Sequence, residues 1–134
     1  MIGIVLVTHG HLADEFLLAM QHVVGVQPQI ATVCVGADDD TEIKREEVFS
    51  KVKEVNTGDG VILLTDIFGG TPSNLATSMF ERANVEVIAG INLPMLIKLT
   101  SLRNEKDLKE IASKIKEAGA KYITIASEIL KENK

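Results

Sequence analysis

Two side chains able to do acid-base or nucleophilic chemistry stand where short aliphatic runs of the sequence end. His9 follows the run of residues 2–7 after a single threonine, and Asp66 directly follows the run of residues 61–65. A neutral imidazole has one nitrogen with a proton and one with a free lone pair, and a carboxylate that accepts the proton's hydrogen bond determines which is which. Side by side, Asp66 would orient the ring of His9 and leave one nitrogen free as a nucleophile.

The residues just after that aspartate are typical of a turn that leads into a helix. Gly69 and Gly70 have no side chains, so their backbone amides can approach a ligand closely. Thr71 is suited to the N-cap of a helix and Pro72 to its first turn, and amides at a helix N-terminus attract anions. We therefore expect a phosphate cradle from the two glycines and Thr71, together with Gly10 at the start of another helix. Gly-Gly-Thr-Pro alone is also an ordinary turn.

Four unbroken aliphatic runs predict the strands that position these residues. Such runs are typical of a parallel sheet with both faces covered, whereas a half-exposed strand alternates apolar and polar residues. Each run is followed by a segment with helical spacing of its apolar residues, so strands and helices alternate along the chain. The predicted strands are residues 2–7, 30–35, 61–65 and 85–89.

This alternation predicts an α/β fold in which helices cover both faces of a parallel sheet. We expect a three-layer, flavodoxin-like architecture with strand order 2-1-3-4, formed by residues 1–134 as a single domain. In that order the winding reverses between strands 1 and 3, and ligands bind in the crevice at such a switch point. These two strands lead into His9 and Asp66, so we expect the two side chains to converge.

Punctuating residues predict where the helices begin and end. Gly25 is expected to stop the first helix. The last helix is expected to begin at Asn104, with Asp107 at its third position, and to stop at Gly119. Residues 122–126 are expected to form a fifth, antiparallel strand. The remaining predicted helices are residues 43–55, residues 72–82 and a short one near residues 90–95.

Composition and charge exclude several classes of protein. The 14 basic and 19 acidic residues give a net charge of −5 without a basic stripe, so duplex nucleic acid is not an expected partner. No apolar run approaches the roughly 18 residues of a membrane span, and no basic region precedes the apolar start. The single cysteine, Cys34, cannot form an internal disulfide, which favours a reducing compartment. We therefore expect a cytoplasmic protein.

Neither a metal nor a cofactor is expected from the sequence. His11 and His22 lie about 16 Å apart along a helix axis, too far to share an ion. Asp38 and Asp40 fall at calcium-loop positions, but the residues required further along that loop are wrong. Cys34 has no nearby histidine in the sequence and is expected in the core. Neither a dinucleotide-binding motif nor a P-loop is present.

Three motifs, in order along the chain, match those of a known family. They are Thr8-His9-Gly10-x-Leu12-Ala13, then Asp66-x-Phe68-Gly69-Gly70-Thr71-Pro72-x-Asn74, then Ile91-Asn92-Leu93-Pro94-Met95. The ordered combination is much more specific than any one motif. Over essentially its whole length, the sequence resembles the IIA component of the mannose family of the bacterial phosphoenolpyruvate-dependent sugar phosphotransferase system.

The resemblance implies a phosphocarrier without a metal. In that family, the histidine of the first motif takes a phosphoryl group from the phosphocarrier protein HPr and passes it to a IIB component, here expected to be a separate polypeptide. Carried over, His9 is the residue phosphorylated, through Nε2, and Asp66 is its hydrogen-bonded partner. Phosphoryl contacts would come from Thr71 and the amides around the two preceding glycines. The family also implies a homodimer joined near residues 122–126, and contact with the membrane only through the sugar permease complex.

Two departures from the family pattern, and three other functions, stay open. Ile67 stands where some members have a hydroxyl residue, and Ser73 replaces an aromatic residue. A related architecture is the phosphotransfer subunit for dihydroxyacetone phosphorylation. A receiver-type domain would be phosphorylated on Asp66 itself, but such domains need an acidic pair after the first strand. The last alternative is a non-catalytic, flavodoxin-like binding module.

Overall fold

The computed structural model describes residues 1–132 and contains a four-stranded parallel sheet. Its strands are β1 (Gly3–His9), β2 (Ile30–Val35), β3 (Val61–Thr65) and β4 (Val85–Ala89). The strand order is β2-β1-β3-β4, so the predicted order 2-1-3-4 is confirmed. The architecture is the expected flavodoxin-like α/β fold, and the predicted strand positions agree closely with the observed ones.

The register of the sheet places the two candidate residues at the same edge. β1 lies between β2 and β3, and both neighbours run parallel to it. Val7 of β1 pairs with Thr65 of β3, and His9 pairs with Val35 of β2. His9 and Asp66 therefore lie at the carboxyl ends of adjacent strands.

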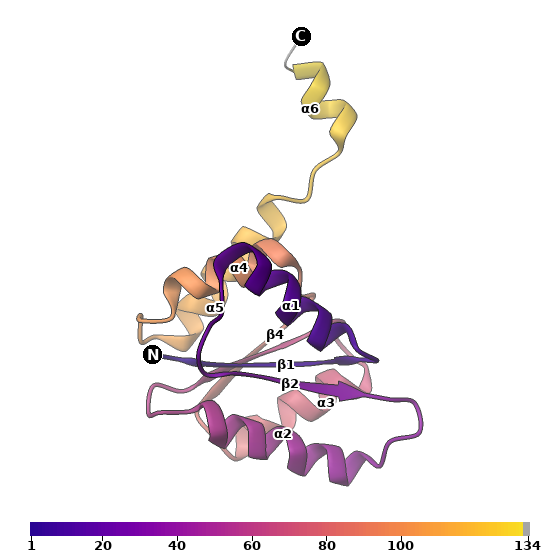
Figure 1. Cartoon of the computed structure of the whole chain (residues 1–134), viewed down its shortest axis with the longest axis vertical. Helices are drawn as coiled ribbons and strands as arrows, with labels where there is room; N and C mark the ends of the chain where they lie inside the picture. Colours follow the sequence, from indigo (N-terminus) through magenta and orange to yellow (C-terminus); the bar gives the residue numbers. More distant parts are fainter. Residues whose placement is uncertain (133–134) are drawn as a thin grey trace.

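Helices cover both faces of the sheet (Figure 1). On one face lie α1 (Leu12–Val24), α4 (Leu93–Leu102) and α5 (Leu108–Lys121), and on the other lie α2 (Thr41–Val55) and α3 (Thr71–Thr77). α3 runs on into a 3₁₀ turn, η1 (Ser78–Glu81), and α6 (Ala126–Glu132) projects beyond α5 from the body of the molecule. In residues 1–132, no helix has the length and apolar character that crossing a bilayer requires.

The core has two halves because the side chains of each strand alternate between the two faces of the sheet. Ile4 and Leu6 of β1 pack on the side of α1, α4 and α5, whereas Val5 and Val7 pack on the side of α2 and α3. All four side chains are fully buried. A strand buried on both faces needs no polar residue at alternate positions, which explains the unbroken aliphatic runs.

Side-chain caps explain where three of the helices begin. Asp40, Asn92 and Asp107 accept hydrogen bonds from backbone amides in the first turns of α2, α4 and α5, respectively. The last long helix was predicted to begin at Asn104, and this start is too early. Asp107 is the N-cap of that helix, and Leu108 is its first residue.

Gly119 does not end α5, contrary to the prediction. It lies inside the helix, where α5 approaches the start of α4. A Cβ at Gly119 would lie 3.0 Å from Cε of Met95 and 3.2 Å from Oδ1 of Asn92. The side-chain amide of Asn92 also donates to the carbonyl of Gly119 at 2.9 Å. The glycine therefore permits close packing of the two helices, and α4 extends to Leu102, past the short helix predicted near residues 90–95.

The fifth strand predicted at residues 122–126 is wrong for the described chain. Residues 123–125 have no regular structure, and α6 begins at Ala126. Ile123 and Ile125 are 75% and 61% exposed. A strand needs a neighbour for its backbone hydrogen bonds, and the four-stranded sheet does not extend to this segment. The apolar side chains of the segment therefore remain on the surface of the single chain.

A buried arginine ties the amino ends of two strands together, at the opposite end of the sheet from His9. Arg103, directly after α4, is 2% exposed. Its Nε and Nη2 donate to the carbonyl of Ile2 at 3.1 and 2.9 Å, and Nη2 also donates to the carbonyl of Gln29 at 3.0 Å. Burial lowers the pKa of this guanidinium group. Arg103 therefore joins the end of α4 to the residues that precede β1 and β2.

Replacing Arg103 with Met is expected to lower the free energy of unfolding by on the order of 2 kcal/mol, because a buried carbonyl deprived of its donors still bears its desolvation cost. Urea unfolding measures the effect. Lys51→Met is the control, since it removes a surface ion pair with Glu54 of the kind that contributes about 0–1 kcal/mol. Equal stability of the two variants would contradict this role for Arg103.

Candidate functional site

His9 and Asp66 meet at the carboxyl edge of the sheet. His9 is the last residue of β1, and Asp66 directly follows β3. The Nδ1 atom of His9 lies 2.8 Å from Oδ2 of Asp66, and the backbone amide of His9 donates to the same oxygen at 3.3 Å. The convergence predicted from the strand order is confirmed.

The carboxyl group of Asp66 is held in its ionised form. Burial by itself raises the pKa of Asp66, but the hydrogen bonds from the ring and the backbone amide of His9 outweigh it and hold that pKa below its usual value. The side chain of Asp66 is 14% exposed and that of His9 is 50% exposed. Because a carboxylate can only accept, Nδ1 of the neutral imidazole carries the proton and Nε2 keeps a free lone pair.

Thr8 and Gly10 fix the backbone on either side of the histidine. Thr8 is fully buried, and its Oγ1 accepts from the amide of Ala13, in the first turn of α1, at 2.7 Å. Gly10 has a φ of +53°, which favours glycine, and its amide donates to the carbonyl of Val35 at 2.9 Å. The turn between β1 and α1 is therefore attached to both α1 and β2, which restricts the position of His9.

Gly70 lies against the edge of the His9 ring that Asp66 does not occupy. A Cβ at Gly70 would lie 2.9 Å from Cε1 and 3.2 Å from Nε2 of His9, so a side chain there would collide with the ring. Gly69, with a φ of +94°, forms the turn that brings Gly70 to this position. Gly70 rather than Thr71 is the N-cap of α3, and no side-chain hydrogen bond caps the helix. Its first-turn amides therefore have no partner within the helix.

A cavity of about 380 Å³ opens beside His9. Gly10 and Thr71 line it with the histidine, and the opposite wall is the segment between β2 and α2, with Val35, Gly36, Ala37, Asp39, Thr41 and Lys44. The sequence motifs did not point to this wall. The signal was available in the strand order, because β2 borders β1 and the segment after β2 must reach the same edge of the sheet.

Lys44 is the cation in the wall of this cavity. Its Nζ donates to a carboxylate oxygen of Glu47 at 2.9 Å and lies 3.7 Å from a carboxylate oxygen of Asp39. The hydrogen bond to Glu47, reinforced by both negative charges, raises the pKa of Lys44. The wall opposite His9 therefore carries a cation whose single charge is outnumbered by those of its two acidic neighbours.

Two large apolar side chains are exposed directly after Asp66. Ile67 is 58% exposed and Phe68 is 78% exposed. Exposed apolar and aromatic side chains that adjoin a polar site are typical of surfaces that contact another protein. The edge of the sheet therefore combines a histidine, a cavity and an apolar rim.

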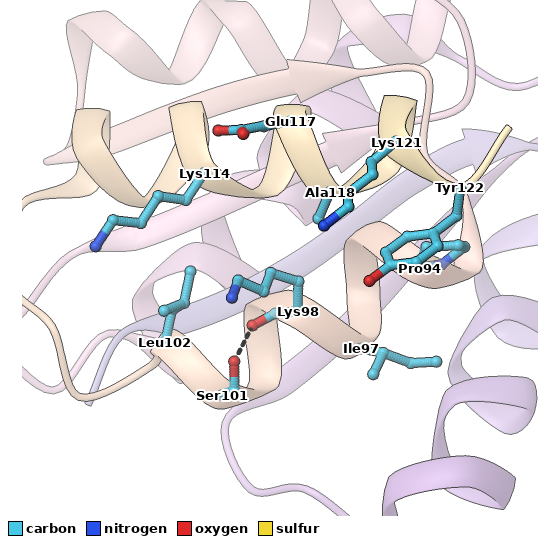
Figure 2. Close-up of a pocket in the computed structure, with 10 residues that line it drawn as sticks. All are labelled: Pro94, Ile97, Lys98, Ser101, Leu102, Lys114, Glu117, Ala118, Lys121 and Tyr122. Atoms are coloured by element: carbon cyan, nitrogen blue, oxygen red, sulfur yellow. Dashed lines mark hydrogen bonds between the residues drawn. The ribbon is translucent and has the colours of Figure 1, made fainter.

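A larger cavity, of about 730 Å³, lies between α4 and α5 and does not include His9 or Asp66 (Figure 2). Its lining combines an apolar floor with three lysines: Pro94, Ile97, Leu102 and Ala118 with Lys98, Lys114 and Lys121. The ten residues of this lining include no histidine. The cavity therefore belongs to the surface near the C-terminal segment and not to the histidine site.

The fold brings His11 and Cys34 together, a proximity that the sequence did not predict. Within residues 1–132, one group of three potential metal ligands comes together, and it consists of His11, Asp14 and Cys34. Neither His9 nor His22 belongs to this group. Cys34 is half-buried and packs against the core on the α1 side of the sheet, and the fold brings it close to His11, which is distant from it in the sequence. The turn between β1 and α1 brings His11 to it.

The fold and the paired histidine and carboxylate define a flavodoxin-like α/β protein with a histidine site at its switch point. A family model described as "PTS system fructose IIA component", where PTS is the phosphotransferase system, matches residues 3–116. The chain belongs to this family, whose members are components of the phosphotransferase system.

Individual relatives agree with this assignment. The PTS system mannose-specific EIIAB component of Escherichia coli K12 is 30% identical over 105 residues, which cover 78% of this chain and 32% of that protein, so the chain spans about a third of its length. The PTS system fructose-specific EIIA component of Bacillus subtilis is 27% identical over 100% of this chain and 92% of its own. The mannose/sorbose-specific IIA subunit of Enterococcus faecalis has a similar structure, with a TM-score of 0.82 and 28% identity over 92% of this chain and 93% of its own.

Gly70→Ala is expected to displace the His9 ring from Asp66, because the new methyl group would lie 2.9 Å from Cε1. The φ of −87° at Gly70 suits alanine, so the change tests the contact and not the backbone. Nitrogen NMR of the imidazole measures the loss of the protonated Nδ1 and unprotonated Nε2 pattern. Ser73→Ala, on the buried side of α3, is the control, and unchanged ring signals in Gly70→Ala would contradict the contact.

Proposed function

We propose that this chain is a phosphocarrier that accepts a phosphoryl group from phospho-HPr on Nε2 of His9 and passes it to a IIB component for sugar uptake and phosphorylation. The observation that carries the proposal is the 2.8 Å contact of His9 Nδ1 with Asp66, in a ring that is half exposed. Asp66 occupies one nitrogen, and the other is left as the nucleophile. Membership of the PTS IIA family supports the same role.

The transfer balances without a metal ion or an added base. The lone pair of Nε2 attacks phosphorus, the bond from phosphorus to the donor breaks, and its electron pair leaves with the donor. The imidazole gains positive charge as the new bond forms, and the ionised carboxylate of Asp66 stabilises that charge through Nδ1–H. Passing the group to the acceptor reverses these steps.

Groups around the cavity can stabilise the phosphoryl oxygens. The backbone of Gly70 adjoins Nε2, and the uncapped first turn of α3 directs amides to the same edge. Thr71 and Gly10 line the cavity beside the ring. Lys44 adds a cation on the opposite wall, a contribution that its acid neighbours reduce. Positioning and amide dipoles therefore supply the stabilisation that phosphoryl transfer requires.

The partner proteins would dock on the rim of the cavity. Ile67 and Phe68 offer exposed apolar surface next to Asp66, as a transient protein contact requires. The relatives named above are described as specific for mannose, fructose or sorbose, so family membership alone does not select one sugar. We place the choice of sugar in other components of the system.

Incubation of the chain with phosphoenolpyruvate, enzyme I and HPr is expected to label the wild type on a base-stable, acid-labile phosphohistidine. His9→Gln is expected to abolish the label, because Nε2 is lost while the fold is kept. Asp66→Asn is expected to slow labelling by roughly 100-fold, because an amide no longer imposes the required tautomer and charge. His22→Gln, on α1 and outside the site, is the control. Radiolabel transfer and mass spectrometry of the modified residue measure each result.

Three outcomes would contradict the proposal and separate its alternatives. A wild-type label at normal rate in His9→Gln would remove the histidine from the mechanism. A base-labile label on Asp66 would indicate receiver-type chemistry. No label on the wild type would indicate a non-catalytic binding module. The two phosphocarrier roles are distinguished by the acceptor: the sugar role predicts that a IIB component removes the label and that a dihydroxyacetone-phosphorylating partner does not.

We also propose that two copies of the chain form a homodimer through residues 122–130. This segment carries several exposed apolar side chains, namely Tyr122, Ile123, Ile125, Ile129 and Leu130. The cavity between α4 and α5 has apolar side chains, three lysines and one acid, Glu117, in its lining (Figure 2). Tyr122 of the same chain also lines it, and the first turn of α6 carries Glu128. Both the apolar surface and the charges favour docking of this segment from a second copy on that cavity.

An Ile123→Asp, Ile125→Asp double variant is expected to be a monomer, whereas the wild type is expected to be a dimer, because two charges replace exposed apolar surface at the contact. Light scattering after size-exclusion chromatography measures the mass. Ile43→Asp is the matched control, since Ile43 is an exposed isoleucine on α2. A wild-type monomer, or a double variant that stays dimeric, would exclude this contact.

A further inference from the structure

Three side chains of different chemistry come together next to the turn that carries His9. His11 is the N-cap residue of α1, Asp14 lies in the first turn of α1, and Cys34 belongs to β2. One ring nitrogen of His11, one carboxylate oxygen of Asp14 and the Sγ of Cys34 all lie within 4.8 Å of one another. The sheet brings them together because Cys34 pairs with Thr8, just before the turn into α1.

This donor set is the one that zinc prefers. Zn²⁺ binds thiolate sulfur, imidazole nitrogen and carboxylate oxygen, and tetrahedral sites with three protein ligands are completed by water. Zinc bond lengths place neighbouring ligand atoms of such a site about 3.5 Å apart. His11 and Asp14 are exposed, so small side-chain rotations can close the remaining distance without moving the core. Hard cations such as Mg²⁺ would not use the thiolate.

A second hydrogen bond orients the carboxylate of this cluster. Oγ1 of Thr32, which lies on β2 two residues before Cys34, donates to Oδ1 of Asp14 at 2.7 Å. The carboxylate of Asp14 also accepts a hydrogen bond from the thiol of Cys34, a contact that a bound ion would replace. Metal sites commonly have a supporting hydrogen bond like that from Thr32, which fixes the direction of the ligating group.

We propose that His11, Asp14 and Cys34 form a zinc site, separate from the pair formed by His9 and Asp66. Binding would release the thiol proton of Cys34 to solvent and leave one coordination position to water. The bound ion would join the start of α1 to β2, directly beside the turn between β1 and α1. This site does not depend on the phosphocarrier role, and each can fail without the other.

Titration of the reduced wild-type chain with Co²⁺ tests the site, because cobalt bound by a thiolate gives a near-ultraviolet charge-transfer band. Cys34 is the only cysteine of the chain, so this band reports on that residue alone. We expect a band that saturates at one ion per chain and disappears when Zn²⁺ is added, because such sites bind zinc more tightly than cobalt. No saturable band in the wild type would overturn the proposal.

Variants then separate a built site from a cysteine that binds cobalt alone. Cys34→Ser is expected to abolish the band. His11→Gln and Asp14→Asn are each expected to weaken cobalt binding by at least roughly 10-fold. Thr32→Val is expected to have the same effect, because it removes the hydrogen bond that orients Asp14. His22→Gln and His9→Gln are the matched controls, with unchanged cobalt binding, and circular dichroism checks the fold of each variant. A folded His11→Gln or Asp14→Asn variant with wild-type affinity would overturn the assignment of that ligand and of the site.

Discussion

The hydrogen bond between Nδ1 of His9 and Oδ2 of Asp66 is the contact on which the rest of the site depends. The sheet forms it because β1 and β3 are parallel neighbours, so their carboxyl ends lie side by side. The bond keeps a mostly buried carboxyl group ionised and gives the imidazole one arrangement of its proton. Thr8 and Gly10 hold the backbone of the histidine, and the absence of a side chain at Gly70 leaves room for the ring. These contacts confine a half-exposed imidazole to a single orientation.

The strands and the meeting of His9 with Asp66 could be predicted because they depend on strong, short-range patterns. A run such as residues 61–65, bounded by a glycine and an aspartate, has few alternatives to a buried strand. Right-handed crossovers then restrict the strand order, and the order alone brings both strand ends to one crevice. Neither step required knowledge of any side-chain contact. The family motifs and the predicted strand order therefore indicate the same two residues, His9 and Asp66.

The features that the sequence did not predict depend on contacts between segments that are distant in the chain. Glycine is the residue type that commonly ends a helix, yet Gly119 instead allows close packing against Met95 and Asn92 at the start of α4. Lys44 reaches the cavity only because β2 lies next to β1. Cys34 and His11 approach each other across the same pair of strands. The segment after α5 has strand-like residues but no strand beside it in one chain, so local propensity could not decide its conformation.

The backbone of Gly70 lies close to Cε1 and Nε2 of the half-exposed imidazole. Asp66 covers Nδ1, so any protein that exchanges a group with Nε2 has to bind over the same exposed part of the ring. In the proposed role, the donor protein and the acceptor protein therefore cannot bind at the same time, and the donor must dissociate before the acceptor binds. Each in-line transfer inverts the configuration at phosphorus, so the two transfers together give net retention, which is observable only when the phosphoryl oxygens are isotopically distinguished. A large excess of either partner protein would therefore slow phosphoryl transfer from donor to acceptor.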